Sequence, residues 1–441
     1  MKKVLLLNPP FNRPIMRDTF HPTSKSALYI WHPLDILIHS GYLTGFDLRV
    51  YDGVVNNNPA NLHRLLEDFK PDGVLSLIAF PTLKSDVQLL EHIKSKYGSV
   101  IWGVGDVTYG EKERLLEQVS VLDGILPDYT SKGFAQFMRG ESPKNAIWRD
   151  GGKIVSETTH EALDWNVPRH DLLDLSKYYL PYWKPPFGSI YATHGCPAKC
   201  RFCVVPGWGP TRFREHEAIL DELEFLRSLG VRKVFFRDGS FNQWPKYTIG
   251  LMEKIASRFP KTFRFTTWFK PKPLSDEMAE AMSDAGFQYV HIGVETGSPE
   301  FLHSIGKDFE VKDVEPGIEI LHRHGIKVVG HFMLALPGET KRDQDMTAAF
   351  LKKTQLDVVS FSIFEFSFGI MMKRGQEAPI AFSDKQIKWE LLRQYSKFYF
   401  RPDRWSKTYF FEDFGHVLQT IPRALRYLFD LRLYPRFKAL E

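Results

Sequence analysis

Short apolar runs alternate with amphipathic segments along the first 145 residues of the chain. The apolar runs predict strands at residues 4–7, 48–52, 73–78, 99–104 and 124–126. The segments between them predict helices at residues 34–40, 60–69, 85–97 and 110–118. This alternation is typical of a parallel, doubly wound α/β sheet. We therefore expect a Rossmann-like domain over residues 1–145, with its ligand beyond the carboxyl ends of the strands.

Residues 146–186 predict a connector. Asp150-Gly151-Gly152-Lys153 is a turn between two short extended pieces, and a stretch rich in proline, tyrosine and tryptophan follows. Its aromatic content indicates a segment that packs across a domain face rather than a disordered linker.

A strand–helix rhythm occurs six times between residues 187 and 370. The strands are predicted at residues 188–193, 233–238, 263–268, 289–295, 327–334 and 358–366. The helices between them are predicted at residues 216–229, 247–259, 275–285, 312–324 and 341–356. A closed barrel of this type has eight units, so six units predict a partial parallel barrel with its chemistry at the carboxyl ends of the strands.

Residues 371–441 predict a C-terminal helical region that caps the barrel mouth. Helices are expected at residues 385–399 and 422–433, and Pro422 suits the first position of the second helix. The basic end of the chain, from Arg423 to Lys438, is consistent with contact to an anionic membrane. A solvated surface is the simpler interpretation.

Composition narrows the class of protein. A net charge of +5 over 441 residues is too weak to indicate a nucleic-acid partner. Aromatic residues make up 14% of the chain, which is compatible with a large apolar or planar small-molecule substrate and equally with thick cores. The N-terminal apolar run is shorter than a signal-peptide core and ends at Pro9-Pro10, and no run is long enough to span a membrane. The chain is therefore expected in the cytoplasm.

All three cysteines, Cys196, Cys200 and Cys203, lie in one C-x3-C-x2-C stretch that follows the first barrel strand. This leaves no disulfide framework and fits a reducing compartment. A structural zinc site needs four ligands, for which only His194 is near, and a redox pair would use Cys200 and Cys203 but leave Cys196 surplus. A [4Fe-4S] cluster with one iron free of protein accounts for all three thiolates. That iron can chelate the amino and carboxylate groups of a small molecule.

Several segments together resemble the radical S-adenosylmethionine (SAM) superfamily, in the subgroup that carries a cobalamin-binding domain. The cysteine stretch with Phe202 before Cys203 matches that superfamily's pattern, and residues 293–298 resemble its G-x-E-S-G-S strand end. Residues 334–340 match the subgroup's L-x-L-P-G-E-T turn, and residues 236–241 resemble its F-x-D-D-x-F segment with Gly239 in place of the second aspartate. The order of domains is also the same.

The resemblance implies cofactors and site residues. It implies that Cys196, Cys200 and Cys203 hold a [4Fe-4S] cluster and that Phe202 lies near the SAM adenine. Asp238 and Glu295 become candidates for the SAM ribose or amino group, with capping of the following helix or turn as the structural alternative. Ser76, Gly103 and Gly105 become candidate contacts to cobalamin. An electron donor such as flavodoxin or ferredoxin is also implied.

The first domain departs from the cobalamin pattern at two points. It lacks D-x-H-x-x-G, because His63 lies in a helical segment without the glycine, and the radical SAM subgroup commonly lacks this motif too. Val104 stands where the subgroup has a second glycine, and its Cβ could crowd the corrin tail. A domain that has lost its ligand is therefore the alternative.

The leading hypothesis is a radical SAM enzyme that cleaves SAM to a 5′-deoxyadenosyl radical and, with cobalamin, methylates an unactivated carbon of a biosynthetic intermediate. The first alternative is a radical oxidative cyclase or rearrangement enzyme. The second is a non-catalytic metal-binding scaffold.

Overall fold

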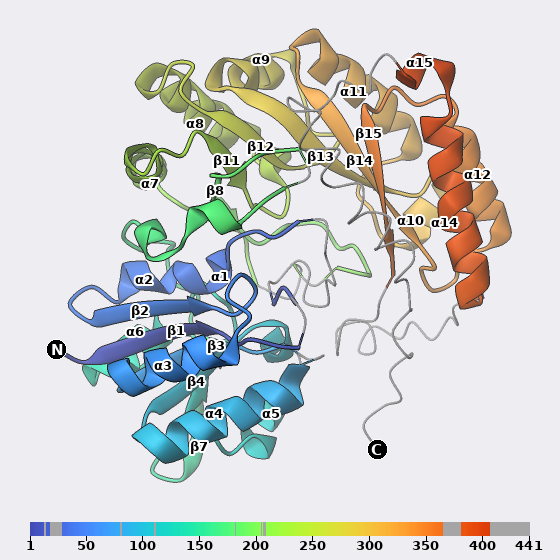
Figure 1. Cartoon of the computed structure of the whole chain (residues 1–441). Helices are drawn as coiled ribbons and strands as arrows, with labels where there is room; N and C mark the ends of the chain where they lie inside the picture. The colour runs from blue at the N-terminus through green and yellow to red at the C-terminus, as the bar shows by residue number, and fades with distance from the viewer. Residues whose placement is uncertain are drawn as a thin grey trace.

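Two β-sheets organise the chain, one built from its first third and the other from its remainder (Figure 1). A computed structural model describes residues 1–12, 15–17, 29–79, 82–109, 112–180, 182–203, 205, 209–364 and 381–405. The expected helix at residues 422–433 and the basic C-terminal end lie outside these ranges. Both sheets carry the strands that the apolar runs predict, so the α/β fold class is confirmed.

The first sheet has seven strands in the order β2-β1-β3-β4-β5-β6-β7. The strands span Lys3–Asn8 (β1), Asp47–Asp52 (β2), Gly73–Leu77 (β3), Val100–Val104 (β4), Gly124–Ile125 (β5), Ala146–Asp150 (β6) and Lys153–Glu157 (β7). β1 to β5 are parallel in a doubly wound order, and β6 and β7 add an antiparallel hairpin. The turn at Gly151-Gly152 therefore belongs to a hairpin of this sheet. The domain boundaries themselves stay a prediction.

Helices cover both faces of the first sheet. They span Leu34–Leu37 (α1), His39–Tyr42 (α2), Pro59–Phe69 (α3), Leu83–Tyr97 (α4), Lys112–Gln118 (α5) and Gly133–Arg139 (α6), with a 3₁₀ turn at Asp106–Tyr109 (η2). In β1, Val4 and Leu6 pack on one face, whereas Leu5 and Leu7 pack on the other. Side chains of a strand alternate between faces, so an uninterrupted apolar run makes a strand that is buried on both sides.

The second sheet is parallel, with six strands in the order β15-β14-β13-β12-β11-β8. These strands span Gly188–Ile190 (β8), Lys233–Phe236 (β11), Arg264–Phe269 (β12), Phe287–Glu295 (β13), Lys327–Leu334 (β14) and Val358–Ile363 (β15). β9 (Thr193–His194) and β10 (Arg212–Phe213) form a separate antiparallel ribbon beyond β8. In the residues described, β8 and β15 each pair on one side only, so the barrel is open, as six units predict.

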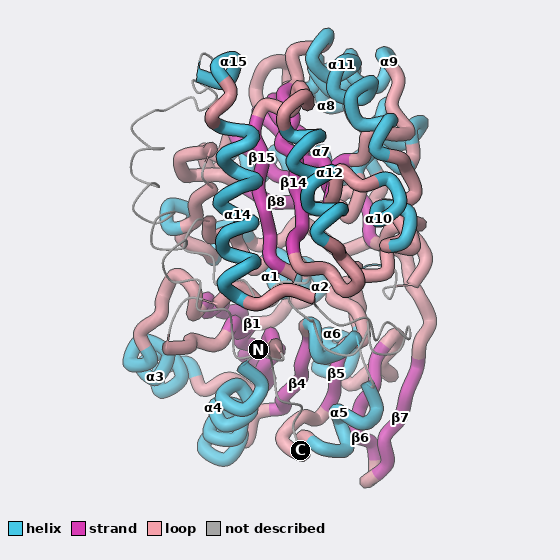
Figure 2. Tube along the Cα trace, turned by 90° about the vertical axis from the view of Figure 1, so that its right-hand side faces the viewer, coloured by secondary structure: helices cyan, strands magenta, loops and turns pink. Residues whose placement is uncertain are grey.

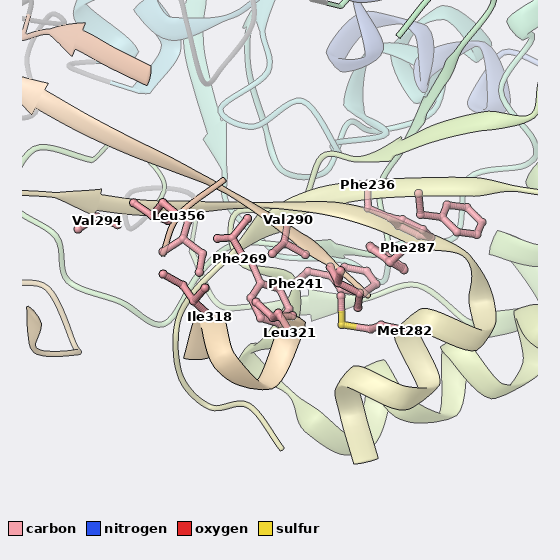
Figure 3. Packing of buried hydrophobic residues seen from close by; sticks show 14 of the residues in the cluster. Phe236, Phe241, Phe269, Met282, Phe287, Val290, Val294, Ile318, Leu321 and Leu356 are labelled. Atoms are coloured by element: carbon pink, nitrogen blue, oxygen red, sulfur yellow. The ribbon is translucent and has the colours of Figure 1, made fainter. Parts of the chain in front are cut away.

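The outer face of the second sheet is covered by helices. They span His216–Ser228 (α7), Pro245–Arg258 (α8), Asp276–Ala285 (α9), Pro299–Ser304 (α10), Val314–Arg323 (α11) and Lys341–Leu351 (α12), with 3₁₀ turns at Phe241–Gln243 (η6) and Val311–Asp313 (η7). Figure 3 shows the apolar layer between sheet and helices, including Phe236, Val290 and Leu321. Ser275, Ser298 and Thr340 accept hydrogen bonds from the first turns of α9, α10 and α12.

The connector packs between the two sheets. It contains the 3₁₀ turns His170–Leu172 (η3) and Leu175–Lys177 (η4). Tyr178, Leu180 and Trp183 are buried in one cluster with Trp31 of the first unit and Phe235 of β11. The aromatic residues of this segment thus fill the contact between the units, as its composition indicates.

The described C-terminal region consists of α14 (Asp384–Tyr399) and α15 (Pro402–Trp405). α14 lies beside α12 and along β15 rather than over the sheet's carboxyl end (Figure 2). The Tyr395 hydroxyl accepts from the Phe361 N–H at 3.2 Å, and the Tyr399 hydroxyl donates to the Val359 carbonyl at 3.0 Å. These hydroxyls satisfy backbone groups of an edge strand. No described helix combines the length and apolar character that a membrane crossing requires.

Candidate functional site

The cysteine loop begins at the carboxyl end of β8, just after β9. Cys200 is buried, Cys196 and Cys203 are half-buried, and all three thiols are free of disulfides. Gly195 enters the loop with φ of 92°, and a Cβ there would lie 3.1 Å from the Thr211 Cα. Glycine is therefore needed where the chain turns into the loop.

Asp238 fastens the start of this loop. Its buried carboxylate accepts from the Thr193 hydroxyl at 2.6 Å, and from the backbone N–H groups of Ala192 and Thr193. Burial raises the pKa of Asp238 to about 6, against the opposing effect of these hydrogen bonds. The carboxylate is engaged by the loop itself, which gives Asp238 a positioning role here. Its predicted contact to SAM stays a prediction.

The segment after α10 supports the other side of the loop. The Arg201 N–H donates to the Ile305 carbonyl at 2.8 Å. Gly306 has φ of 78°, and a Cβ on it would lie 2.9 Å from the Lys199 carbonyl oxygen. The loop thus rests directly on the backbone of residues 305–306.

Glu295 and Lys307 form a buried ion pair beside the loop. Lys307 Nζ lies 2.8 Å from Glu295 Oε1, and each side chain is 9% exposed. A Cβ on Gly293 would lie 2.4 Å from that same Glu295 oxygen. The glycine of the G-x-E stretch therefore makes room for the carboxylate to fold back toward Lys307.

Lys307 connects this ion pair to the cysteine loop. Its Nζ lies 5.7 Å from the centre of the Phe202 ring, within cation–π range. Burial disfavours its charge, but Glu295 and Cys200 together hold the pKa of Lys307 above its ordinary value. Phe202 and Glu295, both predicted as SAM contacts, thus meet at one lysine. Their contact to SAM is still a prediction.

Burial raises the pKa of the Cys200 and Cys203 thiols, to about 12 at Cys203. Lys307 and Lys270 oppose this effect at Cys200. Lys270, at the end of β12, also forms an ion pair of 2.6 Å with Asp308. Two ammonium groups therefore favour negative charge at the loop, where thiolate ligands would place it.

His194 points away from the cysteines toward the first unit. Its Nδ1 lies 3.0 Å from an Arg212 guanidinium nitrogen, and its Nε2 lies 3.7 Å from Asp128, which follows β5. Burial lowers the pKa of His194 to about 4. Arg212 also donates to Asp128 at 2.9 Å. These three residues join the cysteine loop to the carboxyl end of the first sheet.

The candidate cobalamin contacts are packed inside the first unit. The Ser76 side chain is buried and donates to the Leu77 carbonyl. A Cβ on Gly103 would lie 2.3 Å from Ile78 Cδ1, and one on Gly105 would lie 2.2 Å from the Ile78 carbonyl oxygen. The approach of Ile78 accounts for both glycines. Contact of the three residues with cobalamin stays a prediction.

Comparison with known proteins identifies the domain that carries the three cysteines. Residues 190–351 match the model of the radical SAM superfamily, a range that includes the three cysteines, Asp238, Glu295 and Lys307. These residues form a radical SAM domain. A radical SAM domain implies an enzyme that uses a [4Fe-4S] cluster and SAM. The cluster agrees with the prediction from the cysteine spacing, and SAM with the family resemblance.

Relatives are similar in sequence to longer parts of the chain, and a solved structure has a similar fold. The chain is 24% identical over 426 residues to an uncharacterised methyltransferase of Pyrococcus horikoshii, which covers 88% of this chain and 90% of that one. It is 28% identical over 222 residues to the hopanoid C-2 methylase of Rhodopseudomonas palustris, and the match covers 47% of this chain and 40% of the methylase. The radical SAM methyltransferase TsrM of Kitasatospora setae has a similar fold, with a TM-score of 0.64 at 19% identity, covering 84% of this chain and 74% of that one.

The residues of this radical SAM protein fit the cluster. Within the described ranges, no group of three or more histidine, cysteine, aspartate or glutamate side chains is arranged to hold a single metal ion. A [4Fe-4S] cluster distributes its thiolates over different irons, so it does not require the three thiols to converge on one ion. Lys307 and Lys270 supply positive charge beside it.

Sequence reasoning missed Lys307 as a site residue. It follows α10, a six-residue helix that the apolar pattern does not reveal. Ser298-Pro299 was the available signal, because a serine cap followed by proline commonly starts a helix. Gly306, which follows the end of α10, was a second sequence signal for this helix.

Proposed function

We propose that this radical SAM enzyme is a cobalamin-dependent methyltransferase that acts on carbon in a small-molecule biosynthetic intermediate. Methylation is the activity in the names of the Pyrococcus and Rhodopseudomonas relatives. The TsrM structure with a similar fold holds cobalamin together with a [4Fe-4S] cluster.

One observation carries the proposal: the cysteine loop lies where the two units meet. Cys196 and Cys203 pack against the apolar cluster that includes Leu77 and Val104 of the first sheet. His194 and Arg212 reach Asp128 at the carboxyl end of that sheet. Doubly wound sheets bind ligands at this end, so a cofactor of the first unit would lie near the cluster.

The bound groups would supply an electron for SAM cleavage and a methyl carrier. The chain's own residues hold the cysteine loop in position. Asp238 holds the start of the cysteine loop, and residues 305–306 hold its middle. Lys307 places a positive charge between Phe202 and Cys200. The first sheet has the doubly wound strand order expected of a cobalamin-binding domain. Ile78 occupies the space beside Gly103 and Gly105, and Ser76 is hydrogen-bonded to Leu77, so we assign these three residues no role in the reaction.

Anaerobic reconstitution with iron, sulfide and cobalamin tests the proposal. The wild-type protein should retain cobalamin through gel filtration and cleave SAM when dithionite is added. With substrate, the product should gain the mass of one CH2 group, and the label of methyl-labelled SAM should appear in it. Cys200→Ala should abolish SAM cleavage, and Ser228→Ala on α7 should leave it unchanged.

The outcomes separate the parts of the proposal. A protein that cleaves SAM but retains no cobalamin would refute the cobalamin-dependent route. A product that loses two hydrogens instead of gaining CH2 would refute methylation. A Cys200→Ala protein that still cleaves SAM would refute the assigned cluster ligands.

We further infer that the enzyme works in the cytoplasm with a flavodoxin or ferredoxin as its electron donor. The three free thiols support a reducing compartment. Replacing dithionite by a reduced flavodoxin should sustain SAM cleavage, and failure with both flavodoxin and ferredoxin would refute this donor class.

A further inference from the structure

The helix α14 is apolar on two opposite sides. Its inner side carries Leu391 and Phe398, which are buried in the core that α14 shares with α12 and β15. Its outer side carries large apolar side chains that remain open to solvent, with Trp389 66% exposed and Phe400 77% exposed. Figure 2 shows α14 at the surface of the second unit. One apolar side of this helix is therefore left uncovered by the described chain.

The exposed apolar side chains of α14 form one stripe. Trp389, Leu392 and Phe400 are all exposed, although each is a residue that proteins usually bury. At 3.6 residues per turn, the three side chains lie within a sector of about 80° around the helix axis. Eleven residues separate the first from the last, so the stripe is about 17 Å long. We call these three residues the exposed stripe.

Three lysines border the exposed stripe. Around the helix, Lys388 lies along one edge and Lys397 along the other, whereas Lys385 lies at the N-terminal end. We call these three the rim lysines, and none of them forms an ion pair with the described residues. The helix contains two acids, of which Asp384 is exposed and Glu390 is buried. The border of the stripe is therefore mainly positive.

Positive charge continues at the C-terminal end of the stripe. Arg401, which follows α14, donates to the Leu351 carbonyl at 2.9 Å and to the Thr354 carbonyl at 2.8 Å. These hydrogen bonds bring the end of α12 to the end of α14. Lys352 and Lys353, which lie between the two carbonyls in the sequence, are both exposed. The end of the stripe thus has basic neighbours from a second segment.

The sign of these charges distinguishes between the surfaces that could cover the stripe. A second copy of the chain in a twofold contact would place rim lysines opposite rim lysines, because such a contact uses the same patch on both subunits. The basic C-terminal sequence, from Arg423 to Lys438, would also add positive charge to a positive border. An anionic lipid surface attracts the lysines and accepts the apolar side chains, as it does with interfacial amphipathic helices.

We propose that α14 is a peripheral membrane-binding helix, which lays the exposed stripe into the surface of a bilayer that contains anionic lipids. The rim lysines lie at the level of the lipid phosphates, and Trp389 suits the boundary because its ring is apolar and its N–H is polar. This inference adds a partner and is independent of the proposed reaction. β15, which α14 covers, and β8, which leads to the cysteine loop, are opposite edges of the second sheet. The membrane contact therefore uses a part of the chain separate from the cluster residues.

Vesicle flotation tests the proposal on the full-length, reconstituted protein. The wild-type protein should float with vesicles made of equal parts phosphatidylcholine and phosphatidylglycerol. It should bind vesicles of phosphatidylcholine alone much more weakly, because these offer no attraction to the lysines. High salt should release the protein from the anionic vesicles, since salt screens charges at an exposed surface.

Two sets of substitutions separate the charged and apolar contributions. The triple variant Lys385→Gln, Lys388→Gln and Lys397→Gln should weaken partition to anionic vesicles about a hundredfold, because each lysine near such a surface contributes about fivefold. The double variant Trp389→Ser and Phe400→Ser should weaken partition about tenfold for each side chain removed from the lipid.

Substitutions beside α8 supply the matched controls. Lys246→Gln neutralises an exposed lysine, and Trp244→Ser removes an exposed tryptophan. Both control variants should float as the wild-type protein does. Circular dichroism, cluster content and SAM cleavage without vesicles should be the same in all variants. If the double serine variant fails to fold, the lysine variant carries the test, because its substitutions lie at the surface and break no ion pair of the described chain.

Each other result assigns the stripe differently. A wild-type protein that does not float with anionic vesicles, or a folded lysine variant that floats equally well, would overturn the proposal. A dimer in solution that the serine substitutions dissociate, without flotation, would assign the stripe to a second copy. A loss of thermal stability in the serine variant, without flotation of the wild-type protein, would show that the chain covers the stripe itself. A wild-type protein that floats but cleaves no SAM would contradict the proposed function and leave the membrane contact standing.

Discussion

The carboxylate of Asp238 accepts a hydrogen bond of 2.6 Å from the hydroxyl of Thr193, three residues before the first cysteine. The backbone N–H groups of Ala192 and Thr193 donate to the same carboxylate. Asp238 follows β11, and the cysteine loop follows β8, its neighbour in the sheet. The pairing of β8 with β11 thereby fixes where the cysteine loop starts.

Asp238→Asn should lower both stability and cluster occupancy. All three donors reach Oδ1, and the Ala192 N–H also reaches Oδ2. In asparagine the NH2 group replaces Oδ2 and faces the Ala192 N–H, and the remaining oxygen is an uncharged and therefore weaker acceptor. We expect a loss of about 2 kcal/mol in the free energy of unfolding. Iron and sulfide per protein should fall after reconstitution. Asp221→Asn, on the exposed face of α7, is the control. Full cluster content in Asp238→Asn would contradict the role of Asp238 in holding the start of the cysteine loop.

Lys307→Met should be more damaging than the double change Lys307→Met with Glu295→Gln. The single variant leaves a buried carboxylate without its partner, which costs roughly 3–5 kcal/mol. Neutralising Glu295 as well removes that penalty, so part of the stability should return. Denaturant unfolding of the four proteins in the cycle measures the coupling.

The exposed pair of Lys254 and Glu217 supplies the matched comparison for that cycle. Its side chains are 49% and 65% exposed, so solvent screens their attraction and Lys254→Met should have no measurable effect. A double variant of Glu295 and Lys307 that is as unstable as the sum of its singles would show that the pair is not coupled.

Gly103→Ala should destabilise the first unit by about 2 kcal/mol through overpacking. The added Cβ would lie 2.3 Å from Ile78 Cδ1. Valine lacks Cδ1, so Ile78→Val should restore much of the stability in the double variant. Gly105→Ala meets the Ile78 backbone at a φ of 144°, and Ile78→Val should not rescue it. Equal rescue of both glycine variants would argue that Ile78 is not the cause.

Much of the fold could be predicted because the apolar runs are local signals. β1, β13 and β14 lie within two residues of their predicted bounds. The short helices α6 and α10 were missed, since six or seven residues show little periodicity. The hairpin of β6 and β7 was seen as two extended pieces, but its pairing with β5 depends on a contact that no local pattern contains.

The same distinction applies to the site. Three cysteines within eight residues can be recognised from the sequence alone, and so can the G-x-E stretch. The pairing of Glu295 with Lys307 depends on the path of the chain after β13, and the meeting of His291 with His331 depends on the register of β13 with β14. Both contacts are set by packing between distant segments. The sequence therefore reveals the cysteine triplet, but neither Lys307 nor the contact of His291 with His331.

Glu339, in the turn after β14, should make stability fall as pH rises from about 4.5 to about 7. Burial raises its pKa to about 7 from the ordinary 4.5, and Asp343 and Glu390 add to this. The folded state therefore holds a proton that the unfolded state releases in this window, at a maximum cost of about 3 kcal/mol above pH 7. Glu339→Gln keeps the acceptor for the Ala335 N–H, which Glu339 binds at 2.7 Å, and removes the titration.

Unfolding at pH 5 and pH 8 should show that the stability of Glu339→Gln relative to the wild-type protein is greater at pH 8. Glu319→Gln, on the exposed face of α11, should show no such change. An equal difference between variant and wild type at both pH values would show that Glu339 is ionised in the folded state throughout this range.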